Sequence, residues 1–210
     1  MTPENIQALF SDKQGGFHFA RWARPIVPVV FGVDDATLSV VKGAIEAVAA
    51  LAGHSIGETD PEMGANLMVF FLRDWDELAA VPDLDGLVPE LNGLLEKLKS
   101  RGANQYRLFR FESDGSIRAA FVFLRMDVEL TKLAAQDLAL SQMAQVILLW
   151  GRGAFSKTSP IAMAQGIGVL RVEIAGLIRA GYSPMLPAAS QNPAMAYRLF
   201  ARLDQGEAAG

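Results

Sequence analysis

The chain is 210 residues long, with 51% hydrophobic and 20% charged residues and a net charge of −4. This length favours one domain over residues 1–210, and the apolar share excludes a disordered chain. Acidic and basic residues are intermixed without a basic block, so we expect no nucleic-acid partner. The lack of cysteine excludes disulfides, thiol catalysis and cysteine-bound metals.

The N-terminal segment 1–16 is predicted to form a helix and a turn. Thr2-Pro3-Glu4 is typical of a helix start, because it supplies a capping hydroxyl, a proline and an acid near the positive end of the helix dipole. Residues 17–21 then alternate as in an extended edge segment, and we expect a strand over Ile26–Phe31.

The next part of the chain is predicted to contain a helix and a buried strand. Asp34 or Asp35 begins an amphipathic helix that ends at Gly53. The apolar run Leu67–Leu72 is typical of a strand that is buried on both faces.

A leucine-rich helix and a β-hairpin are expected to follow. Leucines between Leu87 and Leu98 recur at helical spacing and form either a core face or an interface. Tyr106–Phe111 and Ile117–Leu124 flank Asp114-Gly115, which suits the positive φ of a hairpin turn. We expect these two strands to share one sheet with the two earlier strands.

The C-terminal third is predicted to be helical, with helices near residues 130–150, 168–180 and 193–203 and a frayed tail at 206–210. Strands with interspersed helices, followed by helices alone, predict an α+β fold with a small mixed or antiparallel sheet. The longest apolar runs have six residues. A membrane-spanning helix needs about 20, so we expect no membrane span.

Both histidines are expected to have structural roles. His18 lies on a predicted strand, and His54 follows a helix C-terminus, where an imidazole interacts favourably with the helix dipole. Because the two histidines are not spaced as a pair of metal ligands and the chain has no cysteine, we expect neither a metal nor a cofactor.

Two glycine clusters resemble phosphate-binding or anion-binding loops. Gly166-Ile167-Gly168 is expected to open a helix, but Arg171 stands where a dinucleotide fingerprint has its third glycine, so we assign no cofactor there. Gly151-Arg152-Gly153 is expected to end the preceding helix. An anion site formed by Arg152 and exposed amides is the alternative.

The main candidate site is the helix predicted near residues 130–150. Asp137, Ser141 and Gln145 are four positions apart and share one helix face, with Gln142 beside them. Ser141-Gln142-Met143-Ala144-Gln145 has the layout of the zincin motif H-E-x-x-H with each functional residue replaced. We expect this face to line a ligand-binding cleft near Arg152, and a solvent-exposed face is the alternative.

Segments from about Phe17 to Leu203 carry a resemblance to a known family. They are Arg21–Val27, Leu51–Ile56, Asn66–Val69, Asp114–Ile117, Ser141–Gln145 and Tyr182–Leu186. The chain resembles a family of uncharacterised, mostly alphaproteobacterial proteins, often secreted or lipid-anchored, that are similar to degenerate zincin-type metallopeptidases. The resemblance implies a zincin-like fold. The acidic residue that the family motif implies is Gln142 here, so we expect no inherited hydrolytic chemistry.

These features favour a non-catalytic protein that binds a small molecule or another protein. A metal-independent hydrolase that uses Asp127, Glu129 or Asp137 as acid or base is one alternative. A structural homo-oligomer that associates through the leucine-rich helix is another. The N-terminus lacks a signal-peptide pattern. We expect a cytoplasmic location if Met1 is the true start, and a periplasmic or secreted location if a signal peptide has been removed.

Overall fold

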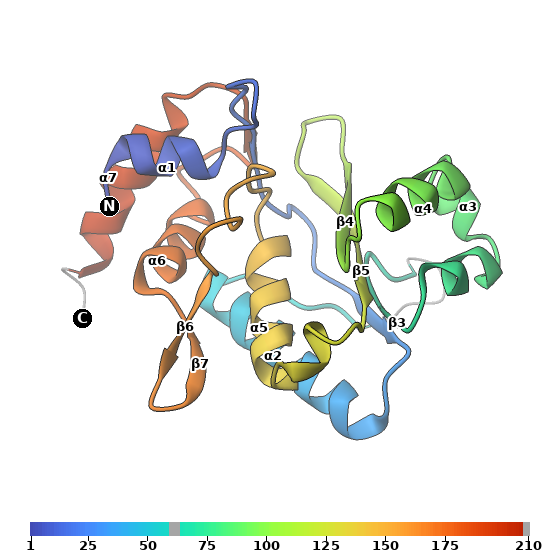
Figure 1. The fold of residues 1–210 in the computed structure, drawn as a ribbon. Coiled ribbons are helices and arrows are strands. Elements are labelled where there is room, and N and C mark those ends of the chain that lie inside the picture. Colours follow the sequence, from blue (N-terminus) through green and yellow to red (C-terminus); the bar gives the residue numbers. More distant parts are fainter. Residues whose placement is uncertain (59–63, 208–210) are drawn as a thin grey trace.

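The computed structural model describes residues 1–58 and 64–207 and has an α+β fold (Figure 1). Its main sheet has four strands in the order β2-β3-β5-β4. The first three strands are parallel, and β4 pairs antiparallel with β5 at one edge. The strands are β2 (Pro28–Phe31), β3 (Leu67–Leu72), β4 (Gln105–Phe111) and β5 (Ile117–Arg125). The expected mixed sheet, with its β4–β5 hairpin, is therefore confirmed.

Helices cover both faces of this sheet, so the two central strands are buried on both sides. One face of β3 and β5 packs against a cluster that includes α2 (Asp35–Ala52), α5 (Ala135–Val146) and α6 (Val172–Gly181). The opposite face, which includes Phe70 and Phe123, packs against η1 (Trp75–Ala80), α3 (Leu84–Leu87) and α4 (Leu91–Ser100). Figure 1 shows α3 and α4 on one side of the sheet and α5 on the other.

The leucine stripe of α4 belongs to the core. Leu91, Leu95 and Leu98 are buried against the sheet, together with Phe121 and Phe123. Two other leucines of the predicted stripe differ: Leu94 is partly buried, and Leu87 lies in α3 and is 44% exposed.

The two ends of the chain lie together. The helices α1 (Pro3–Leu9) and α7 (Met195–Glu207) pack against each other, and β1 (Phe19–Ala20) pairs with β8 (Ala189–Ser190). Thus α7 extends beyond its predicted end at residue 203 and includes the first two residues of the tail that we expected to fray. The rest of that tail, 208–210, lies outside the described residues.

The predicted helix caps are confirmed. The hydroxyl of Thr2 accepts from the N–H of Asn5 at 3.3 Å, and Asp34 accepts from the N–H of Thr37 at 2.7 Å. Gly53 ends α2 with a φ of 63°, in the left-handed region that favours glycine.

The C-terminal third is largely helical but contains a β-hairpin that the sequence analysis missed. The strands β6 (Ile161–Ala164) and β7 (Ile167–Leu170) are joined by Gln165 and Gly166, whose φ angles are 51° and 82°. Positive φ at both central residues is the geometry of a tight hairpin turn. The prediction that Gly166-Ile167-Gly168 opens a helix is therefore wrong, since α6 begins at Val172.

The predicted long helix at 130–150 is also shorter than expected. A short 3-10 turn, η2 (Leu130–Lys132), precedes α5, which ends at Val146. Gly151 therefore does not end this helix. Among the described residues, no helix is long and apolar enough to cross a membrane.

The hairpin docks on α5 through a close approach at Gly168. The backbone N–H of Gly168 donates to Oδ1 of Asp137 at 3.1 Å, and a Cβ at position 168 would collide with that carboxylate.

We expect Gly168→Ala to destabilise the protein by roughly 1–3 kcal/mol, because the carboxylate or the strand must move. The double variant Asp137→Ala/Gly168→Ala removes the obstacle. Urea unfolding should therefore show it to be less destabilised than the sum of the single variants, and additive losses would contradict the docking.

Candidate functional site

A groove of about 1510 Å³ runs along β4, between α5 on one side and α4 on the other, and continues to the segment that ends in β6. Figure 1 shows β4 standing between these two helices. All five residues of the predicted cleft line this groove: Asp137, Ser141, Gln142, Gln145 and Arg152. The structure thus gathers them around one hollow.

The C-terminal end of α5 is held beside the groove by three aromatic donors. Nε1 of Trp22 donates to Val146 O at 2.9 Å, and Nε1 of Trp150 donates to Ala144 O at 2.8 Å. The hydroxyl of Tyr182 donates to Ile147 O at 2.9 Å. The last carbonyls of a helix lack partners within the helix, so these donors satisfy groups that would otherwise be buried unpaired. Burial raises the pKa of Tyr182, which stays a neutral donor.

The polar residues of α5 have different surroundings. Gln142 is only 4% exposed, whereas Ser141 and Gln145 are partly exposed. The amide nitrogen of Gln145 bonds within its own helix, to the hydroxyl and carbonyl of Ser141, both at 3.2 Å. Of Ser141, Gln142 and Gln145, Gln142 is therefore the one whose side chain bonds to another element.

Gln142 forms a polar cluster with two residues of β4. Its Nε2 donates to Oε1 of Gln105 at 2.8 Å, and Nη2 of Arg107 donates to Oε1 of Gln142 at 2.9 Å. The same Nη2 donates to Oε1 of Gln105 at 3.1 Å. Side chains two positions apart on a strand share a face, so Gln105 and Arg107 both point toward α5.

Arg107 is the central charge of this cluster. Burial lowers its pKa to about 10, so it remains cationic at neutral pH. Among the described residues it has no carboxylate within ion-pair distance, and its Nε is buried without a hydrogen-bond partner. Neither Gln105 nor Arg107 was predicted from the sequence as a site residue. The available signal was polar residues at alternate positions of a strand predicted to pack in the sheet.

The other two predicted residues lie at the margin of the groove. Asp137 is bonded to Gly168 in the hairpin, and Arg152 is exposed in the loop that follows α5. The proposed alternative, an anion site made by Gly151-Arg152-Gly153 alone, is weakened by Gly151, whose N–H donates to Leu9 O at 2.8 Å.

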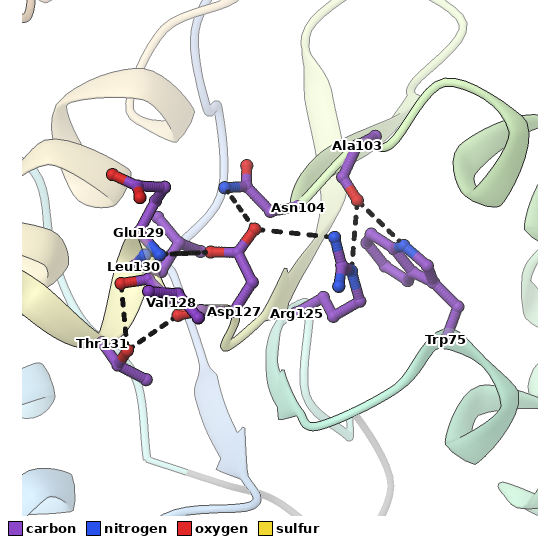
Figure 2. Close-up of polar contacts among 9 residues, drawn as sticks. All are labelled: Trp75, Ala103, Asn104, Arg125, Asp127, Val128, Glu129, Leu130 and Thr131. Carbon is purple, nitrogen blue, oxygen red and sulfur yellow. Dashed lines mark hydrogen bonds and ion pairs between the residues drawn. The ribbon is translucent and has the colours of Figure 1, made fainter.

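Asp127, the first carboxylate of the hydrolase alternative, stabilises a turn (Figure 2). Its Oδ1 accepts from the N–H groups of Glu129 and Leu130, both at 3.0 Å, while Oδ2 accepts from Asn104 at 3.0 Å and pairs with Arg125 at 3.5 Å. The Leu130 N–H bond, more than any other contact, lowers the pKa of Asp127. A carboxylate held in its ionised form in this way is a weak base.

The carboxylates of the other two members of that alternative have different partners. Glu129 is exposed and pairs with Lys132 at 2.9 Å, and Asp137 bonds to the hairpin. Of these three carboxylates, only Asp137 lines the groove.

The histidines have structural surroundings. His54 Nε2 lies 2.9 Å from Arg24 O, its ring packs 5.1 Å from that of Tyr182, and burial lowers its pKa. His18 lies 3.5 Å from Asp12. Within residues 1–58 and 64–207, no group of three or more histidine, cysteine, aspartate or glutamate side chains is placed to hold a metal ion.

Comparison of the chain with protein-family models, with curated proteins and with solved structures gives no match. The zincin resemblance inferred from the sequence therefore stays a prediction.

The two glutamines of α5 provide a matched pair of substitutions. We expect Gln142→Leu to destabilise the protein by about 1–3 kcal/mol, because it removes both hydrogen bonds that join α5 to Gln105 and Arg107. Gln145→Leu should change stability by no more than roughly 0.5 kcal/mol, because this amide bonds only within its own helix. Urea unfolding of the two variants measures the difference, and equal effects would contradict the cluster.

The Asp127 turn predicts a pH-dependent contribution to stability. Because the folded-state pKa of Asp127 is lowered, its contribution is present above the unfolded-state pKa and is lost as the pH falls through the folded-state pKa. We therefore expect Asp127→Asn to be less stable than the wild type at pH 7, with the difference shrinking below about pH 4. Glu129→Gln, which breaks an exposed ion pair, serves as the control and should have little effect at any pH. A difference for Asp127→Asn that persists unchanged to pH 2 would rule out this role.

Proposed function

We propose that this protein is a non-catalytic binding protein that holds an extended polypeptide segment along the free edge of β4. The observation that carries the proposal is that every residue from Gln105 to Phe111 lines the groove. An exposed sheet edge accepts an added strand through main-chain hydrogen bonds.

The register of β4 determines which backbone groups are free. The N–H of Arg125 donates to Asn104 O at 2.8 Å, and Tyr106 and Phe123 are the next hydrogen-bonding pair along the hairpin. The alternation of an antiparallel pair then turns the N–H and C=O groups of Gln105, Arg107 and Phe109 outward, toward the groove. Such a row of outward groups matches the main chain of an extended peptide.

The two walls of the groove differ in chemistry. On the α4 side, Leu94 and Leu98 form an apolar strip beside Tyr106 and Leu108, with Lys97 and Arg101 at its margin. The α5 side carries the polar cluster of Gln105, Arg107 and Gln142. Because alternate side chains of a strand point to opposite faces, a bound segment would place apolar residues toward α4 and polar residues toward α5.

This proposal agrees with the resemblance to degenerate zincin-type metallopeptidases. The helix that carries the altered motif lies beside the groove, and neutral Gln142 stands in place of the acidic residue of the motif. A neutral amide that bonds to Gln105 and Arg107 is not a base that can accept a proton from water, so we favour binding over hydrolysis.

A proline at position 109 tests the strand-edge proposal. Proline removes one outward N–H but no bond to β5, and prolines are tolerated at such edge positions. Peptides selected on the wild-type protein from a random twelve-residue display library should bind Phe109→Pro at least about tenfold more weakly than Phe109→Ala. The alanine variant is the control, because it loses the same ring and keeps the N–H.

The peptide backbone provides an independent measurement that does not depend on the stability of the variant. N-methylation at alternate positions of a selected peptide should abolish binding to the wild-type protein in one register and leave it intact in the other. Selected peptides that bind Phe109→Pro and Phe109→Ala equally and tolerate N-methylation in both registers, or a library that gives no binder, would refute the proposal.

A further inference from the structure

The charge of the groove differs in sign from that of the whole chain. The chain carries a net charge of −4, yet six basic side chains line the groove and only two acidic ones do. The basic residues are Lys97, Arg101, Arg107, Arg110, Arg152 and Lys157. A concave surface lined by one sign of charge attracts ligands of the opposite sign.

Neither acidic residue of the groove neutralises Arg107. The carboxylate of Asp137 is engaged by the N–H of Gly168, and Glu90 forms no ion pair with Arg107 among the described residues. A guanidinium that is partly removed from water without a counter-charge is costly.

The two glutamines hold this guanidinium without cancelling its charge. Both accept from the same nitrogen, Nη2. A guanidinium has five N–H donors, and within the described part of the chain Nε and Nη1 make no hydrogen bond. The neutral amides thus fix the orientation of Arg107. Because Nε is buried, Nη1 supplies the donors for a further acceptor.

We propose that the polypeptide bound along β4 is acidic, and that one of its carboxylates pairs with Arg107. This inference rests on the proposed function and names the chemistry of its ligand. A carboxylate supplies the missing counter-charge, and pairs of guanidinium and carboxylate form strong, charge-assisted hydrogen bonds. Gln105 and Gln142 are positioning residues for Arg107, and they act by binding it while remaining neutral.

The role of the glutamines gives a test with two opposite effects. Gln142→Glu places a carboxylate of the protein itself against Arg107, so thermal unfolding should occur at a higher temperature while binding of acidic peptides falls at least about tenfold. Arg107→Gln should weaken the same peptides by a similar factor. Arg179→Gln makes the same charge change on the exposed surface of α6, outside the groove, and serves as the control with unchanged binding.

A double-mutant cycle identifies the carboxylate. In library-selected peptides, each aspartate or glutamate is replaced in turn by its amide. We expect one replacement to cost about tenfold against the wild type and nothing against Arg107→Gln. Peptides that depend on the β4 edge in the Phe109 test yet show no coupling to Arg107 would overturn this inference and leave the proposed function intact. Acidic peptides that couple to Arg107 but bind Phe109→Pro and Phe109→Ala equally would refute binding along the β4 edge and leave the pairing of a carboxylate with Arg107 intact.

A small-molecule titration tests the carboxylate without any peptide. The Nε–Hε resonance of Arg107, assigned by its loss in Arg107→Lys, should shift saturably with glutarate and not with glutaramide. No shift with glutarate, or a saturable shift with inorganic phosphate alone at equal ionic strength, would overturn the assignment of a carboxylate.

Discussion

The packing of α5 against the sheet depends on hydrogen bonds to the backbone carbonyls at the C-terminal end of this helix, inside the core. Trp22 and Tyr182 reach the last carbonyls of the helix from segments that are distant in the sequence, and Trp150 reaches back from the loop that follows the helix. Since each donor is itself packed in the same core cluster, the helix cannot rotate or slide without leaving buried carbonyls unpaired. This constraint fixes the face of α5 that meets β4 and therefore places Gln142 over Gln105 and Arg107.

The sequence predicted the features whose causes are local. Caps at Thr2 and Asp34, the Asp114-Gly115 turn and the apolar strand Leu67–Leu72 are each determined by neighbouring residues, and the structure has all of them. The β6–β7 hairpin was missed for a local reason as well. Its strands are four residues of small or apolar side chains without polar alternation, and its turn is Gln-Gly rather than Asn-Gly or Asp-Gly.

The candidate site shows where local reasoning ends. Helical spacing grouped the polar residues of α5, all of which line the groove, but it treated Ser141, Gln142 and Gln145 alike, although of these three only Gln142 is buried. Its partners lie 35 and 37 positions away, on a strand whose pairing also turns Gln105 and Arg107 toward the helix. Periodicity within one element cannot reveal a contact of that kind, because the contact exists only once the sheet edge and the helix are packed.

The free edge of β4 also raises the question of why it does not pair with other copies of the chain. Exposed edges promote aggregation unless charges, bulges or covering elements protect them. Here Arg107 and Arg110 lie along the strand, the register shifts between Arg110 and Phe111, and α4 and α5 wall the groove on both sides. The edge of a second sheet would bring its own flanking helices against these walls and its own arginines against these charges. A single extended acidic segment meets neither obstacle, so the features that protect the edge are the same ones that select its ligand.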